Sequence, residues 1–128
     1  MNAYERLLKY VVIRTPSNEE SETTPSSQCQ FDLANVLKKE MEELGICDVT
    51  LTDTCFLYGK IPATPGCENA PAIGFIAHMD TVSDYCDHDI KPMITENYDG
   101  EALALGESEL VLSPEMFPHL KSMKGRTL

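Results

Sequence analysis

Apolar positions near the N-terminus recur with the spacing of a helix. From Tyr4 to Val12 they fall at i, i+3, i+4, i+7 and i+8, and Pro16 follows shortly afterwards. Positions with this spacing share one face of an α-helix, so the pattern predicts an amphipathic helix. The helix is expected to end before Pro16, because a proline pushes the residue before it out of the helical region.

A second helical pattern follows a loop, residues 17–27, that is rich in Ser, Thr, Glu and Pro. Ser27 and Gln30 have the spacing of a capping box, and Gly45 suits the position just after a last helical turn. The predicted buried stripe consists of Phe31, Ala34, Leu37, Met41 and Leu44. The charged residues 38–40 and 42–43 are expected to face solvent.

A two-residue alternation replaces the helical spacing after Gly45. Residues 48–52 alternate polar and apolar side chains, as a half-buried strand does. Residues 56–61 predict a second strand, and Asp53 and Thr54 suit the turn between them. The pattern therefore favours an α/β fold.

A short, continuous apolar run, residues 73–77, stops abruptly at His78 and Asp80. Such a run predicts a buried strand of a mainly parallel sheet that is covered on both faces. Residues two apart in a strand project to the same face, so the imidazole and the carboxylate are expected to lie side by side. Open α/β sheets bind ligands just beyond the carboxyl ends of their strands.

The pair has the chemistry of a metal site, although it is incomplete. A neutral imidazole is a good zinc ligand, and a carboxylate can accept its other N–H and so fix the tautomer. His78 is therefore a candidate metal ligand, with Asp80 as its partner. Zinc usually takes four ligands, however, and a His-x-Asp pair alone is also typical of hydrogen-bonded surface residues.

Charge and length narrow the classes of function. The 128 residues allow at most one domain, and 21 acidic against 10 basic residues give a net charge of -11. Such a surface repels phosphate backbones, which argues against a nucleic-acid partner. No apolar run approaches the roughly 20 residues of a membrane span.

The acidic cluster Asp84, Asp87, His88 and Asp89 lacks the calcium-loop pattern and is interpreted as a polar loop.

The five cysteines are scattered without a C-x-x-C pair. An odd number without zinc-ribbon spacing is typical of free thiols in a reducing compartment. The N-terminus is interrupted by Asn2, Glu5 and Arg6, which is unlike a signal peptide. The expected location is the cytoplasm.

Several segments resemble one family in the right order. Residues 70–81, Ala-Pro-Ala-Ile-Gly-Phe-Ile-Ala-His-Met-Asp-Thr, resemble the first metal-site segment of the peptidase T family, which are tripeptide aminopeptidases. That family belongs to the larger group of co-catalytic zinc aminopeptidases, carboxypeptidases and acylases. Further segments similar to the family are residues 4–11, 37–45, 49–51, 96–100, 104–106 and 112–118. The resemblance therefore covers nearly the whole chain.

The resemblance implies a fold and a set of roles. The implied fold is a three-layer α/β/α catalytic domain with a mixed, mainly parallel sheet, of which residues 1–128 are the N-terminal portion. It implies that His78 is the first zinc ligand and that Asp80, counted as catalytic, buttresses it. In the complete enzyme two zinc ions would hold the substrate, and a glutamate would act as general base on the water that attacks the first peptide bond of a tripeptide.

The family's bridging Asp, Glu-Glu pair, further Asp and distal His match nothing before Leu128, and its lid and dimerisation domain is also missing. We therefore expect no peptide hydrolysis by residues 1–128 alone, and one credible ligand does not predict zinc binding by this fragment. Two alternatives stay open: a non-catalytic α/β interaction domain derived from the same fold, and a dipeptidase, carboxypeptidase or amide deacylase of the same family, since His-x-Asp does not distinguish substrates.

Overall fold

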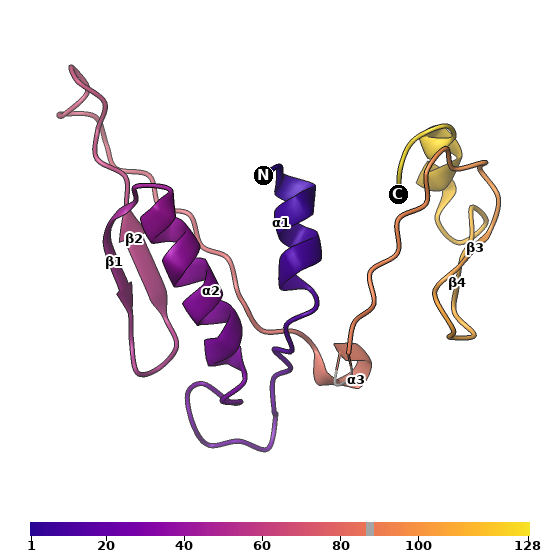
Figure 1. The fold of residues 1–128 in the computed structure, drawn as a ribbon, viewed down its shortest axis with the longest axis horizontal. Helices are drawn as coiled ribbons and strands as arrows, with labels where there is room; N and C mark the ends of the chain where they lie inside the picture. The colour runs from indigo at the N-terminus through magenta and orange to yellow at the C-terminus, as the bar shows by residue number, and fades with distance from the viewer. Residues whose placement is uncertain (87–88) are drawn as a thin grey trace. The chain divides into compact units, whose positions relative to one another are not determined.

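The structure is a computed structural model that describes residues 1–86 and 89–128. Asp87 and His88, two members of the acidic cluster, lie outside the described residues. The chain divides into two compact units, Met1–Ile90 and Lys91–Leu128. The elements of the first unit are α1 (Ala3–Tyr10), α2 (Gln30–Glu43), β1 (Cys47–Leu51), β2 (Leu57–Lys60) and α3 (Ser83–Cys86) (Figure 1). Those of the second are β3 (Leu103–Ala104), β4 (Val111–Leu112) and the 3-10 helix η1 (Pro118–Met123).

Helix α1 confirms the first helical pattern but is shorter than the apolar spacing suggests. The backbone N–H of Asn2 donates to the Glu5 carboxylate at the start of the helix. The helix ends at Tyr10, and a turn follows in which the N–H of Ile13 donates to the Tyr10 carbonyl over 3.0 Å. Val12, the last apolar position of the pattern, is 50% exposed.

Helix α2 packs against β1 and β2 and forms the main helix–sheet contact of the first unit (Figure 1). The predicted helix is confirmed, but its N-cap residue is Cys29 and no side chain caps it, so the predicted capping box is not formed. Leu33 and Ala34 are 8% and 0% exposed, whereas Leu44, which the stripe placed in the core, is 60% exposed. The helix has already ended when the chain reaches Leu44.

Strands β1 and β2 confirm the predicted pair and form an antiparallel hairpin. Thr50 lies opposite Tyr58, and Leu51 lies opposite Leu57. The register shifts between Cys47 and Thr50, where Asp48 adopts a φ of 54°, as at a β-bulge. The turn buries the Cys55 side chain, which is 6% exposed. Burial disfavours the charged thiolate and raises the pKa of the Cys55 thiol.

The apolar run at residues 73–77 differs from its prediction. It forms neither a helix nor a strand, has no strand partner in the described part of the chain, and exposes its side chains to solvent. Ile73 is 80% exposed, Phe75 is 95% exposed and Ile76 is fully exposed. The prediction of a buried strand in this chain is therefore wrong. The pattern reports what a segment prefers to bury, but burial also needs neighbouring strands, and the described residues supply none to this segment.

Both sheets of the described residues are two-stranded and antiparallel. The general α/β character is confirmed, whereas the mainly parallel sheet is not observed. No helix in the described segments combines the length and the apolar character that a membrane span requires.

The second unit has a small core of its own. Tyr98 is 2% exposed and Leu120, in η1, is 4% exposed. The end of the chain pairs with residues 95–98: the N–H of Tyr98 donates to the Arg126 carbonyl over 2.9 Å, and Thr95 and Leu128 exchange two backbone hydrogen bonds of 2.8 and 2.9 Å. Strands β3 and β4 confirm that residues 111–112 are extended.

Candidate functional site

The candidate site begins with a tether that joins residue 81 to the segment after α1. The N–H of Thr81 donates to the Thr15 carbonyl, and the N–H of Ser17 donates to the Thr81 carbonyl, both over 2.9 Å. These bonds form an isolated parallel bridge between Pro16 and Thr81. The Ser17 hydroxyl adds a 3.1 Å bond to the same Thr81 carbonyl. Because Thr15 is only 3% exposed, this tether is shielded from competing water.

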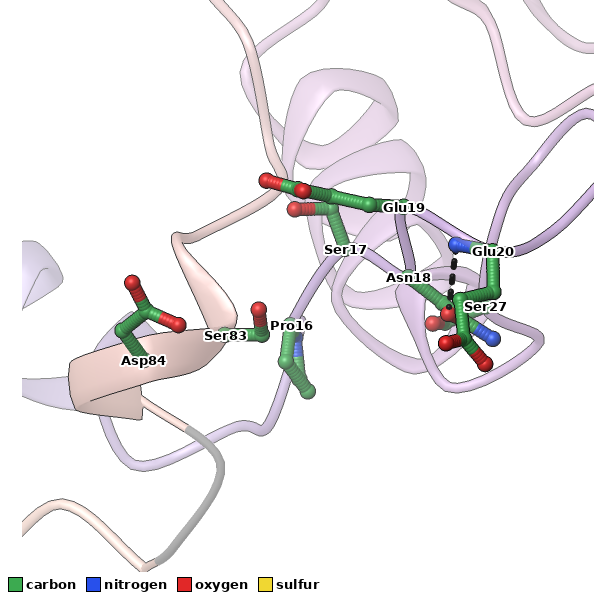
Figure 2. A pocket seen from close by; sticks show the side chains of 8 residues that line it. All are labelled: Pro16, Ser17, Asn18, Glu19, Glu20, Ser27, Ser83 and Asp84. Atoms are coloured by element: carbon green, nitrogen blue, oxygen red, sulfur yellow. Dashed lines mark hydrogen bonds between the residues drawn. The ribbon is translucent and has the colours of Figure 1, made fainter.

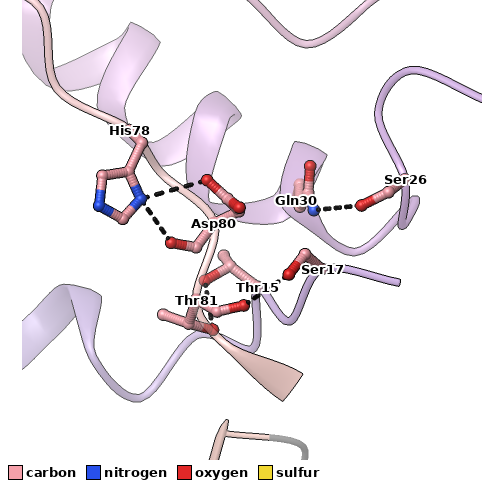
Figure 3. A network of polar contacts seen from close by, with 7 residues as sticks. All are labelled: Thr15, Ser17, Ser26, Gln30, His78, Asp80 and Thr81. Atoms are coloured by element: carbon pink, nitrogen blue, oxygen red, sulfur yellow. Dashed lines mark hydrogen bonds and ion pairs between the residues drawn. The ribbon is translucent and has the colours of Figure 1, made fainter. Parts of the chain in front are cut away.

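His78 and Asp80 lie side by side just before the tether, as the two-residue spacing predicted. Nδ1 of His78 lies 2.8 Å from the backbone carbonyl oxygen of Asp80 and 3.2 Å from its Oδ1 (Figure 3). Both oxygens act as acceptors, so Nδ1 carries the proton and donates it. In the neutral ring the lone pair then sits on Nε2, which has no hydrogen-bond partner among the described residues.

This arrangement leaves the ring accessible. The side chain of His78 is 85% exposed and that of Asp80 is 45% exposed. A ring whose Nδ1–H is held by a carboxylate and whose Nε2 faces outward is the arrangement that metal-binding histidines use. The geometry is compatible with the roles that the resemblance implies, and those roles stay predictions.

An apolar groove of about 480 Å³ borders the pair. One side comes from α1 and the turn after it, including Leu7 and Ile13, and another comes from Leu33 and Leu37 of α2. Residues 77–81, together with Cys86 and Ile90 further along, complete the lining. The exposed imidazole therefore sits at the border of an apolar hollow, in which a hydrogen bond or a charge is stronger than in open water.

The α1 side of this groove is held against α2 by a polar cluster. The hydroxyl of Tyr10 donates to the carboxylate of Glu40, and Arg6 forms an ion pair with the same carboxylate. The Tyr10 hydrogen bond and, after it, the Arg6 charge hold the pKa of Glu40 below its ordinary value of 4.5. Burial and the bond to Glu40 raise the pKa of Tyr10.

The charge pattern predicts Glu40 on the solvated face of α2, and that prediction is wrong, since Glu40 is 8% exposed. One signal could have found it. Leu33, Leu37 and Glu40 are spaced i, i+4 and i+7, so Glu40 continues the buried stripe by one turn.

A second, polar pocket of about 410 Å³ lies on the loop after α1 (Figure 2). Glu19, Glu20 and Asp84 line it together with Ser17 and other small polar residues. Within the loop, the N–H of Glu20 donates to Oδ1 of Asn18 over 3.1 Å. Among residues 1–86 and 89–128, no three His, Cys, Asp or Glu side chains are grouped closely enough to hold a metal ion, in this pocket or elsewhere.

Comparison with known proteins shows which class this sequence resembles. No protein-family model matches the chain. Nearly the whole chain is nevertheless similar to a set of bacterial peptidases. They are peptidase T proteins: that of Alkaliphilus oremlandii is 44% identical over 129 residues and covers 99% of this chain. Those of Desulfitobacterium hafniense and Bacillus cereus are 48% and 42% identical over 125 residues and cover 97% of it. The resemblance to the peptidase T family is thus confirmed.

The coverage is unequal in the two directions. The chain spans 32% of the Alkaliphilus oremlandii protein and 30% of the other two. Any activity of the relatives is therefore that of a polypeptide about three times longer.

Proposed function

We propose that this chain supplies the first metal-binding histidine of a tripeptide aminopeptidase, an enzyme that releases the N-terminal residue from tripeptides. One observation carries the proposal: His78 is held through Nδ1 by Asp80 while Nε2 faces outward, in a chain 42–48% identical to peptidase T. The proposed activity belongs to the complete protein, because the chain spans about 30% of its relatives.

The proposed fold of that complete protein is a three-layer α/β/α catalytic domain, with residues 1–128 as its N-terminal portion. The run at residues 73–77 supports this, because a strand that is apolar on both faces suits the middle layer of such a domain. We also propose a cytoplasmic location, which the five cysteines, all free thiols, support.

The residues present do not fit a complete zinc site. His78 is one candidate ligand, zinc takes about four, and the described residues contain no further group of ligands beside it. In the proposed role His78 would contribute Nε2, and Asp80 would fix its tautomer and orientation. We therefore expect the 128-residue chain alone to hydrolyse no tripeptide.

A chimera tests the proposal. Residues 1–128 replace the aligned part of the Alkaliphilus oremlandii peptidase T, and the chimera is assayed on a tripeptide with zinc present. We expect activity that is lost in His78→Ala. Asp80→Asn should lower kcat and leave KM nearly unchanged, because the side-chain acceptor 3.2 Å from Nδ1 loses its negative charge, whereas the backbone carbonyl at 2.8 Å still holds the ring.

His119→Ala is the matched control, since His119 is an exposed histidine whose ring contacts Phe117 edge-on. It should leave activity unchanged. A His78→Ala chimera as active as the parent would refute the assigned role. A folded chimera without activity would instead favour the non-catalytic interaction domain.

A further inference from the structure

The peptide bond between Asp80 and Thr81 connects the imidazole of His78 to the tether. The carbonyl oxygen of this peptide lies 2.8 Å from Nδ1 of His78. Its N–H donates to the carbonyl of Thr15 over 2.9 Å. The peptide is trans, so its C=O and its N–H point in opposite directions within one rigid plane. Holding the N–H towards Thr15 therefore aims the carbonyl oxygen at His78.

The two acceptors that Nδ1 faces differ in how firmly they are held. The Asp80 carboxylate oxygen, 3.2 Å from Nδ1, is the end of a side chain that is 45% exposed and can rotate. The Asp80 carbonyl oxygen is closer, at 2.8 Å, and belongs to the backbone. Hydrogen bonds that share a peptide group also polarise one another, so the bond to Thr15 strengthens the bond to His78. The carbonyl is therefore the acceptor that fixes the ring.

The segment that receives the N–H of Thr81 is stiff and shielded. Thr15 is 3% exposed, and as the residue before Pro16 it is biased towards extended conformations. The ring of Pro16 fixes its own φ. Beyond it, Ser17 donates twice to the Thr81 carbonyl, from its N–H over 2.9 Å and from its hydroxyl over 3.1 Å. Thr81 is thus bound through both its N–H and its carbonyl, and its backbone cannot rotate without breaking these bonds.

We propose that Thr15 and Ser17 are positioning residues for His78. Thr15 holds the N–H of Thr81, and Ser17 holds its carbonyl. The peptide between Asp80 and Thr81 transmits this constraint to Nδ1 of the imidazole. The hydrogen bond at Nδ1 decides which ring nitrogen carries the proton, so these two residues set the Nδ1–H tautomer and leave Nε2 facing outward. The inference rests on the proposed function for the use of Nε2, but not for its orientation.

The tautomer of His78 tests the inference in the 128-residue chain itself, with no metal added. Nitrogen-15 NMR of the histidine rings at about pH 8, where histidine side chains are ordinarily neutral, distinguishes Nδ1–H from Nε2–H, and His78→Gln assigns the signals. We expect mainly Nδ1–H in the parent. Thr81→Pro keeps both acceptors of Nδ1 but removes the donor to Thr15. It should lower the ratio of Nδ1–H to Nε2–H roughly two- to tenfold, the range that one hydrogen bond supplies, and Asp80→Asn should lower it less.

A milder variant keeps the test decisive if Thr81→Pro disturbs the fold, which circular dichroism would show. Ser17→Ala removes only the hydroxyl donor to the Thr81 carbonyl and should lower the tautomer ratio about twofold. Ser17→Thr, which keeps a hydroxyl, should restore it. Ser21→Ala is the matched control, because Ser21 is a serine of the same loop whose hydroxyl lies 3.0 Å from that of Thr23, and it should leave the ratio unchanged.

An unchanged ratio in both Thr81→Pro and Ser17→Ala, or a loss that Ser17→Thr does not restore, would overturn the inference. A larger fall in Asp80→Asn than in a folded Thr81→Pro would overturn it too, because the carboxylate would then be what fixes the ring. The ratio is measured without activity. An inactive chimera beside a tautomer that follows the tether refutes only the proposed function, and an active chimera beside a tautomer insensitive to the tether refutes only this inference.

Discussion

Leu33 and Leu44 are two leucines of the α2 region for which the apolar pattern and the structure disagree about which side chain is buried. The pattern includes Leu44 in the buried stripe and omits Leu33, whereas the structure leaves Leu33 8% exposed and Leu44 60% exposed. Replacing each by alanine removes the same atoms from two different environments. The comparison therefore tests which face of α2 packs in solution.

The expected magnitudes follow from burial. Burying a whole leucine side chain stabilises a protein by about 1.5–3 kcal/mol, and truncating a buried one to alanine costs about 2–5 kcal/mol. Leu33 borders an open groove that water can refill, so Leu33→Ala should lie near the lower bound, at about 2 kcal/mol. Leu44→Ala should cost less than about 1 kcal/mol, because most of its side chain is already in water.

Urea unfolding followed by circular dichroism at 222 nm measures both effects. With a urea m-value of about 1–3 kcal/mol/M, Leu33→Ala should lower the midpoint by roughly 0.7–2 M and Leu44→Ala by less than half as much. Equal shifts, or a larger shift for Leu44→Ala, would refute the packing described for α2 and restore the stripe that the sequence pattern predicts.

Two further predictions concern pH and the end of α2. The folded chain holds the pKa of Glu40 below its ordinary value of 4.5. The stability that the ionised Glu40 contributes is therefore present above that pH and is lost as the pH falls below it. In Glu40→Gln the melting temperature should fall less steeply below pH 4.5 than in the parent, whereas Glu42→Gln, on the exposed face, should behave like the parent. Parallel curves of melting temperature against pH for Glu40→Gln and the parent would contradict this. Gly45→Ala should cost about 1 kcal/mol in urea unfolding, because Gly45 has a φ of +78° with open space around it. Gly74→Ala, also in open space but without a positive φ, should stay within about 0.5 kcal/mol of the parent, and equal losses would show that backbone strain is not the cause.

Local geometry is the part of this molecule that its sequence predicts well. The two helices and the hairpin follow from periodicity, and the pairing of His78 with Asp80 follows from their separation by two residues. Both are properties of a few consecutive positions. The 3.2 Å between Nδ1 and Oδ1 is reached although residues 73–77 belong to no sheet, so the pairing of His78 with Asp80 does not depend on one.

Contacts between distant segments were not predictable in the same way. Glu40 is buried because Tyr10 and Arg6, from a helix some thirty residues earlier in the chain, contact its carboxylate. Nothing in the sequence of α2 alone indicates these contacts. For residues 73–77 the error is the reverse, because they were predicted to be buried and are exposed. Their pattern correctly states a preference for burial, but the preference is satisfied only where other strands are available.

The tether at Thr81 has a consequence for how this sequence tolerates change. Helix α2 and the β1–β2 hairpin lie entirely between its two ends, at residues 15–17 and 81. The residues between these ends therefore form a loop that the hydrogen bonds of Thr81 close, and the chain after the loop starts from the same place whatever the loop's length. Insertions or deletions in the proline-rich stretch 62–71 would change the length of this loop without moving His78 away from α1. The cost is small, because each doubling of a loop's length costs only roughly 0.6 kcal/mol of closure free energy.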